Sequence, residues 1–206
     1  MMATQPVVFS AAVEGIVDEA VLRRLCASIG VGLGAVYGRN GKAYILQRLV
    51  GYNHSARFRH WVVVLDLDDD AHCAPEILPK WLAQPSRLMH LRVAVRESEA
   101  WLLGDRERLS TYLSVPAARI PVNPETVLDP KLAIVNLARQ SRRRAIREDI
   151  VPREGSGQSV GPAYTSRMVE FVQDLARGWR PDVAANSCDS LQRCIQALSA
   201  LATESL

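Results

Sequence analysis

Long hydrophobic runs are missing from this sequence of 206 residues. No apolar stretch approaches the roughly 20 residues that a membrane-spanning helix needs, so we expect no membrane-spanning segment. The first residues, MMATQPVVFSAAVEG, contain no basic segment ahead of an apolar one. We therefore expect no signal peptide, no membrane partner and a cytoplasmic location.

Paired cysteines are missing as well. The four cysteines, Cys26, Cys73, Cys188 and Cys194, form no Cys-x-x-Cys pair, and His72 beside Cys73 has no second Cys/His pair. This spacing argues against a structural zinc site, which needs four such ligands. Without a secretory context we expect reduced, mostly buried thiols.

Two nucleotide-binding motifs are incomplete. In GLGAVYGRNGK the glycine spacing is wrong for a Walker A loop, and Ala43 stands where that loop requires Ser or Thr. A dinucleotide-binding fingerprint needs several glycines after the first strand, and only Gly15 is found there. Neither a P-loop ATPase nor a nicotinamide-dependent enzyme is therefore expected.

What the sequence does contain is a regular alternation of strand-like and helix-like segments. The apolar patterns predict strands at 6–15, 31–38, 59–68 and 87–95, and helices at 16–30, 42–57 and 74–83. The third strand is apolar without interruption, which is typical of a parallel strand covered on both faces. We predict an α/β fold with a mainly parallel four-stranded sheet.

Strand patterns end after Arg96. Helical periodicity predicts helices at 97–113, 131–151, 163–178 and 187–202, with a Pro-rich connector at 115–130 and a Gly/Ser-rich loop at 152–162. We thus expect an α/β core over residues 1–100 and a helical C-terminal extension, residues 101–206, packed on it.

The third strand ends in an unusual run of acids, WVVVLDLDDD. In an extended chain Asp66 and Asp68 point to one side and Leu67 to the other. Carboxylates so close together repel each other unless a cation lies among them. The run therefore predicts a cation site.

Acids also follow two other strands. The set comprises Glu14 after the first strand, Asp66 and Asp68 after the third, and Glu97 and Glu99 after the fourth. Ligands of open parallel sheets bind beyond the carboxyl ends of the strands. Hard oxygen ligands there favour Mg²⁺ or Mn²⁺. Other acids, Asp69, Asp70, Asp105 and Glu107, are interpreted as solvated surface charge.

These motifs carry a family resemblance. A strand ending in Glu14-Gly15, followed by an apolar strand ending in Asp66-x-Asp68, resembles the Toprim domain of topoisomerases, primases and OLD-family nucleases. The stretches VVVLDLDDD, VAVRESEAWLLGD and DPK (129–131) are similar to a narrower bacterial family of Toprim-like proteins often encoded beside ATPases in defence loci. The resemblance implies a Toprim-like core with a helical cap.

The resemblance also implies roles for single residues. Glu14 matches the Toprim glutamate, a general acid/base or metal ligand, and Asp66 and Asp68 match the metal-binding aspartates. Glu99 would be an added catalytic and metal-binding carboxylate, with Glu97 as its competitor. The lysine found at the metal site of such nucleases has two candidates here, Lys42 and Lys131, and the loop 154–159 is the one candidate for their Ser/Gly-rich loop.

A basic run, RQSRRRAIRE, is the predicted nucleic-acid contact. On one continuous helix Arg139, Arg143 and Arg147 would share a face and could follow phosphates, joined by Lys42 and Lys131. A solvated helix face paired with acids such as Glu148 is the alternative. No aromatic residues are interleaved, so base-specific reading is not expected.

The sequence thus predicts a metal-dependent nuclease or nuclease-like effector subunit of bacterial defence, acting on DNA in preference to RNA. One alternative is a non-catalytic partner subunit of an ATPase that retains the acids as a regulatory site. Another is a small-molecule phosphohydrolase with Asp66 as nucleophile, although such enzymes have Thr or Val where Asp70 stands.

Overall fold

The computed structural model describes residues 7–204; Pro6, the first residue of the first predicted strand, lies outside this range. The strands are β1 (Val8–Val13), β2 (Gly32–Gly38), β3 (Trp61–Asp66) and β4 (Met89–Ala94). The helices are α1 (Ile16–Ser28), α2 (Lys42–Ser55), α3 (Ala74–Trp81), α4 (Ser98–Gly104), α5 (Arg106–Leu113), α6 (Pro130–Arg139), α7 (Arg144–Ile150), α8 (Tyr164–Gln173), α9 (Pro181–Ala184) and α10 (Asp189–Glu204), with 3₁₀ turns η1 (Ala117–Arg119) and η2 (Pro124–Thr126).

The four strands form one sheet in the order β2-β1-β3-β4, and every neighbouring pair is parallel. The predicted α/β class and parallel sheet are confirmed. The β3–β4 register runs without interruption from Trp61 opposite Met89 to Asp66 opposite Ala94. The first five residues of β3 are buried, as a central strand covered on both faces requires.

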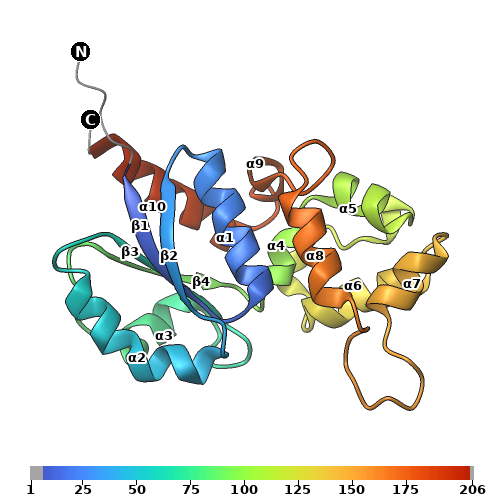
Figure 1. Ribbon diagram of the computed structural model, residues 1–206, viewed down its shortest axis with the longest axis horizontal. Helices are drawn as coiled ribbons and strands as arrows, with labels where there is room; N and C mark the ends of the chain where they lie inside the picture. The colour runs from blue at the N-terminus through green and yellow to red at the C-terminus, as the bar shows by residue number, and fades with distance from the viewer. Residues whose placement is uncertain (1–6, 205–206) are drawn as a thin grey trace. The chain divides into compact units, whose positions relative to one another are not determined.

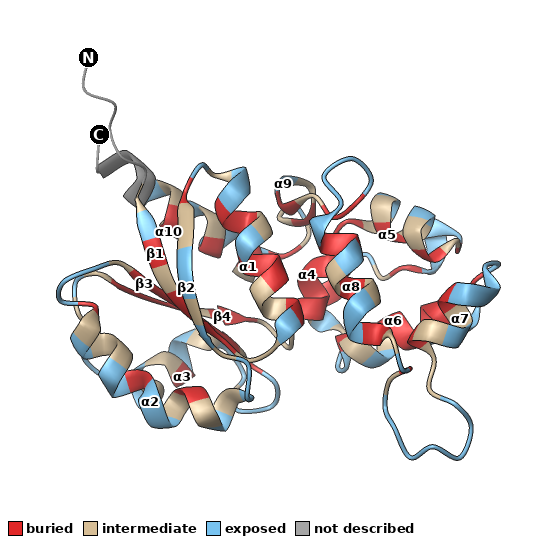
Figure 2. Cartoon of the chain, viewed as in Figure 1, coloured by how far each residue is buried: buried red, intermediate tan, exposed pale blue. Residues whose placement is uncertain are grey.

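Helices cover both faces of this sheet (Figure 1). On one face α2 buries Ile45 and Leu49 against Trp61, Val63 and Leu65 of β3. The same face carries α3 further along the strand, whereas α1 and the later turns of α10 lie on the opposite face. Most residues of β1, β3 and β4 are buried, whereas no residue of the edge strand β2 is (Figure 2).

The chain divides into two compact units. Unit 1 contains residues 1–95 and 192–206, and unit 2 contains residues 96–191. The boundary predicted at residue 100 thus lies at 95/96, and most of α10 is grouped with the sheet. Unit 2 consists of helices and turns, as expected for residues after Arg96.

One predicted helix, 97–113, is interrupted in unit 2 by Asp105. This residue is fully buried, and its carboxylate accepts the N–H of Arg108 at the start of α5. It also accepts three hydrogen bonds from the backbone and guanidinium of Arg180, at 2.8–3.0 Å. The interpretation of Asp105 as solvated surface charge is therefore wrong.

The basic run is interrupted in the same way. The helix predicted over 131–151 is two helices, because Ser141 accepts the backbone N–H of Arg143 at 3.0 Å and the N–H of Arg142 binds the Ser114 carbonyl. Such side-chain-to-backbone bonds compete with helical ones. Arg143 consequently precedes α7 in extended conformation, so the expected single face of Arg139, Arg143 and Arg147 is not formed.

None of the four cysteines forms a disulfide, and Cys26, Cys188 and Cys194 are buried while Cys73 is exposed. Burial raises the pKa of each of the three buried thiols to about 12. Within the described residues no helix has both the length and the apolar character to cross a membrane.

Candidate active site

The sheet of unit 1 reverses its strand order between β1 and β3. The chain passes from β1 to β2 on one side and continues from β3 to β4 on the other. In open α/β sheets the crevice for ligands lies at such a reversal, outside the carboxyl ends of the strands. Glu14 follows β1 directly, and Asp66 ends β3. Both predicted residues therefore stand at this position of the sheet.

Glu14 extends the hydrogen bonding between these two strands. Backbone pairing of β1 with β3 ends at Ala12 opposite Val63. Beyond it, the Glu14 carboxylate accepts the backbone N–H of Asp66 at 2.8 Å. One Glu14 carboxylate oxygen thus takes the place of the main-chain carbonyl that would accept this N–H if the pairing of β1 with β3 continued. The other carboxylate oxygen takes no part in this bond.

The surroundings of Glu14 change its protonation. The pKa of the Glu14 carboxyl is raised from 4.5 to about 7, chiefly by burial and to a smaller extent by the nearby Asp18 and Asp68 carboxylates. The bond from the Asp66 N–H and the Lys42 ammonium lower the pKa in part. A carboxyl with a pKa near neutrality can both take up and release protons, which is what a general acid/base requires.

Two further acids of the run, Asp68 and Asp70, lie beside Lys42. Its ammonium lies 2.5 Å from Asp68 and 2.7 Å from Asp70. Asp68 has a positive φ of 47°, a left-handed conformation that Asp adopts more readily than most residues, and this turns the chain after β3. Leu67 is buried, between the half-buried Asp66 and the exposed Asp68. Because β3 ends at Asp66 and Asp68 has a positive φ, the extended geometry from which a common side was expected for the two aspartates does not reach Asp68.

A tight turn brings Lys42 to this edge. Gly38 has φ = 92°, and an added Cβ would lie 2.3 Å from the Val13 carbonyl oxygen. The following N–H groups bind the end of β1, Arg39 to Val13 and Gly41 to Glu14, at 2.8 and 3.0 Å. Since α2 begins immediately afterwards, its first residue, Lys42, is held beside Glu14.

The donor chemistry of this edge suits a hard cation, although the described residues hold no group of three His, Cys, Asp or Glu side chains arranged for one. Mg²⁺ usually binds one or two protein carboxylates and completes its shell with water and substrate phosphate. Asp66 and Asp68 are the two carboxylates that could take this part here. In the structure the positive charge beside Asp68 is the Lys42 ammonium.

The other predicted acids belong to a second cluster, within unit 2. We call Glu97, Glu99, Lys131 and Tyr164 the Glu99 cluster. Glu99 is 3% exposed and accepts the Tyr164 hydroxyl at 3.1 Å. The Lys131 ammonium lies 3.2 Å from Glu97 and 3.6 Å from Glu99. This buried Glu99 raises the pKa of the Tyr164 hydroxyl, second to the effect of burial itself.

Each unit therefore brings part of the predicted set together. Unit 1 combines Glu14, Asp66, Asp68 and Lys42, and unit 2 combines Glu97, Glu99 and Lys131. Sequence reasoning missed two participants. Asp70 was present in the acid run but was interpreted as surface charge, and Tyr164 comes from a helix start with no distinguishing pattern.

Arg139 and Arg147 both line an open cavity of about 770 Å³ in unit 2, which Arg143 does not line. Arg143 instead extends its guanidinium to the Tyr112 carbonyl at 3.4 Å. Comparison of the chain with family models, curated proteins and solved structures found no match.

Proposed function

We propose that this chain is a hydrolase of phosphodiester bonds in nucleic acid, with its reaction centre at the carboxyl ends of β1 and β3. The observation that carries the proposal is Glu14: it stands where the strand order reverses, contacts the Asp66 N–H at 2.8 Å and has a pKa of about 7. Few structural ion pairs need a carboxyl that titrates near neutrality, whereas proton transfer does.

In this proposal Glu14 accepts the proton of the attacking water. The water oxygen forms a bond to phosphorus, the bond from phosphorus to the leaving oxygen breaks, and solvent protonates that oxygen. Lys42 stabilises the charge on the phosphate oxygens when it exchanges its bond to Asp68 or Asp70 for one to substrate. Asp66 and Asp68 would hold Mg²⁺ or Mn²⁺, which when bound neutralises phosphate charge.

Nucleic acid is the proposed substrate because basic groups occur in both units. Lys42 lies at the acidic edge of unit 1, while Arg139 and Arg147 line the cavity of unit 2. The Toprim resemblance further leads us to propose DNA in preference to RNA, an ATPase partner in bacterial defence and a cytoplasmic location.

The test is cleavage by the full chain of DNA and RNA, single- and double-stranded, with Mg²⁺ or Mn²⁺. Asp66→Asn should lower the cleavage rate by a factor of about 100 or more, since an amide is a poor ligand for a hard cation. Glu14→Gln should lower it by a similar factor of about 100, the lower end of general-base effects. The matched control is Asp69→Asn, an exposed residue of the same run, which should retain the rate. Cleavage that survives Asp66→Asn would contradict the proposal.

A second function is favoured by the Lys42 bonds. Because one lysine already binds both Asp68 and Asp70, part of the negative charge of this edge is compensated without a metal, as a non-catalytic partner subunit of an ATPase would need. Wild-type protein that cleaves no nucleic acid, alone or with its ATPase, would support this function. Hydrolysis of a simple phosphate monoester but not of nucleic acid would support a small-molecule phosphohydrolase.

A further inference from the structure

The loop 152–162 borders the cavity of unit 2 and is closed at its base by main-chain hydrogen bonds. At the base of the loop 152–162, the N–H of Gly161 binds the Ile150 carbonyl at 2.8 Å and the N–H of Ala163 binds the Asp149 carbonyl at 2.9 Å. The two chain segments at the base of the loop lie so close together that a Cβ added to Gly161 would be 2.5 Å from the backbone carbonyl oxygen of Asp149. The base of this loop is therefore tied by main-chain hydrogen bonds to the last turn of α7, which contributes Asp149 to the cavity lining.

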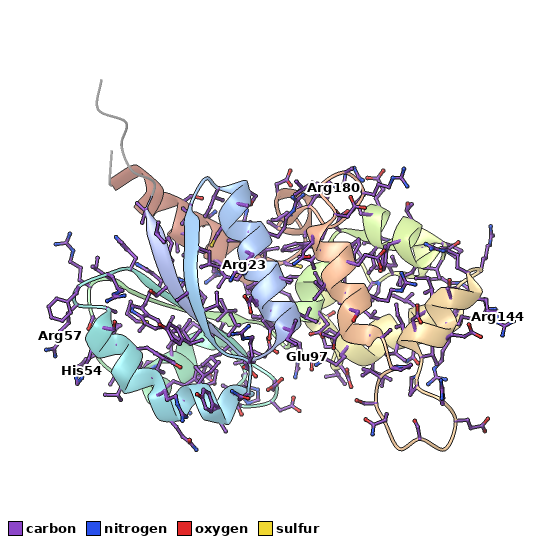
Figure 3. All side chains as sticks on the ribbon, in the orientation of Figure 1. Arg23, His54, Arg57, Glu97, Arg144 and Arg180 are labelled. Atoms are coloured by element: carbon purple, nitrogen blue, oxygen red, sulfur yellow. The ribbon has the colours of Figure 1, made fainter. Side chains whose placement is uncertain are left out.

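The charges around this cavity are not balanced. Two acids line it, but each is paired with an arginine that is not part of the lining. Glu148 binds Arg144 at 2.8 Å. Arg144 is the first residue of α7, and its side chain points away from the helix into solvent (Figure 3). Asp149 accepts two hydrogen bonds from Arg167, at 2.7 and 2.8 Å.

Three arginines of the lining are left without a carboxylate. Within residues 7–200, whose side chains the structure describes, no acid lies within ion-pair distance of Arg139, Arg147 or Arg153. Arg147 donates to the Ser141 carbonyl, which fixes its guanidinium near the junction of α6 and α7. Three guanidinium groups thus border one cavity with their charge uncompensated.

We propose that this cavity binds the phosphate group of a nucleotide. A phosphate presents three or more oxygens to planar guanidinium groups, which match them with paired N–H donors, whereas a carboxylate presents only two. Pro152 and Pro162 supply an apolar wall beside the arginines. The volume of about 770 Å³ lies within the range of about 300–1,000 Å³ found for small-molecule sites.

This inference deepens the proposed function and rests on it for the choice of a nucleotide as ligand. It differs from a flat electrostatic track because it assigns one phosphate to one cavity and adds Arg153, which the basic run did not contain. The phosphate belongs either to a free nucleotide or to the terminal nucleotide of a chain.

The experiment is calorimetric binding to the full chain without divalent metal, so that cleavage plays no part. The probes are AMP against adenosine, and 5′-phosphorylated dithymidylate against the same dinucleotide without the phosphate. At least one phosphorylated probe should bind about tenfold or more tightly than its unphosphorylated form, the size expected of charge-assisted hydrogen bonds. Tighter binding of AMP identifies a free nucleotide as the ligand, and tighter binding of the dinucleotide identifies a chain end.

Arg139→Ala and Arg153→Ala should each weaken this binding about tenfold. Both side chains are exposed, so their loss leaves the core intact, and Arg153→Gln is a second, milder variant. The matched control is Arg142→Ala, an exposed arginine of the same run outside the cavity, which should bind as the wild type does. Asp66→Asn should also bind AMP normally, which separates this site from the reaction centre. Equal binding with and without phosphate, or an equal loss in Arg142→Ala, would overturn the inference.

Discussion

Each unit contains a lysine placed between two carboxylates, but the burial of the partners is reversed. In unit 1 the Lys42 side chain is 15% exposed, while Asp68 and Asp70 are 48% and 41% exposed. In unit 2 the Lys131 side chain is 38% exposed, while Glu97 and Glu99 are 20% and 4% exposed. In unit 1 the cation is thus the more buried partner, and in unit 2 the two anions are.

This difference indicates different roles. Exposed carboxylates keep most of their hydration, so Asp68 and Asp70 can exchange Lys42 for another cation at small cost. A buried carboxylate loses its hydration and must be satisfied inside the protein, as Glu99 is by Tyr164 and Lys131. This contrast is why we propose the acidic edge of unit 1 as the reaction centre and a structural part for the Glu99 cluster.

The largest expected effect is at Glu99. Glu99→Ala removes the acceptor of the buried Tyr164 hydroxyl and should lower the free energy of unfolding by about 3 kcal/mol. Asp70→Ala, the matched loss of an acid in unit 1, should lower it by less than about 1 kcal/mol. Urea denaturation measures both values. Equal losses of unfolding free energy in Glu99→Ala and Asp70→Ala would contradict the different roles that the burial of the two clusters indicates.

At Glu14 we expect a substitution to raise the free energy of unfolding instead of lowering it. Between its ordinary pKa of 4.5 and its folded pKa of about 7 the folded state binds more protons than the unfolded state, so stability falls as pH rises through this interval. Glutamine can still accept the Asp66 N–H but cannot ionise. Allowing for solvent screening of a half-buried group, Glu14→Gln should be more stable than the wild type by about 1–2 kcal/mol at about pH 8.

The same variant should match the wild type at about pH 4, where the wild-type carboxyl is protonated in both states. Thermal unfolding across this pH range measures the difference. A difference that does not depend on pH would mean that Glu14 ionises normally, and would remove the main argument for proton transfer.

Tyr164→Phe tests the Glu99 cluster with a smaller change. The variant keeps the ring and removes only the hydroxyl that donates to Glu99 at 3.1 Å. It should lower the free energy of unfolding by about 1 kcal/mol, the usual net value of one hydrogen bond. Tyr112→Phe is a comparison in the same unit, because the Tyr112 hydroxyl lies 2.8 Å from the Arg167 carbonyl oxygen and 2.9 Å from Glu170, a carboxylate that is more exposed than Glu99. A smaller loss for Tyr164→Phe than for Tyr112→Phe would contradict the structural role of the cluster.

The smallest effect on stability is expected at Lys42. Lys42→Met removes two exposed ion pairs and should change the free energy of unfolding by less than about 1 kcal/mol. The pKa of Glu14 should nevertheless rise further, because the ammonium that lowers it is gone. A carbon-13 NMR titration of the Glu14 carboxyl follows this pKa. An unchanged value would mean that Lys42 does not act on the proposed reaction centre.

The sheet could be predicted because its information is local. An uninterrupted apolar run marks β3 as a strand buried on both faces, and acids that follow parallel strands can be predicted to lie at one edge of the sheet whatever the strand order. Glu14 and Asp66 were therefore recognisable before their contact was known. Their distance and the pKa of Glu14 were not, because both depend on how β1 and β3 pair.

The helices of unit 2 were predicted with the wrong boundaries, for a physical reason. Periodicity continues through Asp105 and through Ser141, but each residue makes a hydrogen bond that the regular helix cannot accommodate, and Asp105 depends for it on Arg180, 75 positions away.

By itself, then, the sequence determined the α/β class, the strand positions and which acids follow them, since hydrophobic periodicity and strand ends are properties of neighbouring residues. Only the tertiary structure decided which charges neutralise each other. Lys42 meets Asp68 and Asp70 across the sheet edge, Glu99 meets Tyr164 within unit 2, and Arg139, Arg147 and Arg153 are left together at one cavity. Ion pairing depends on distances of a few ångströms between residues remote in the chain, and no local pattern encodes those distances.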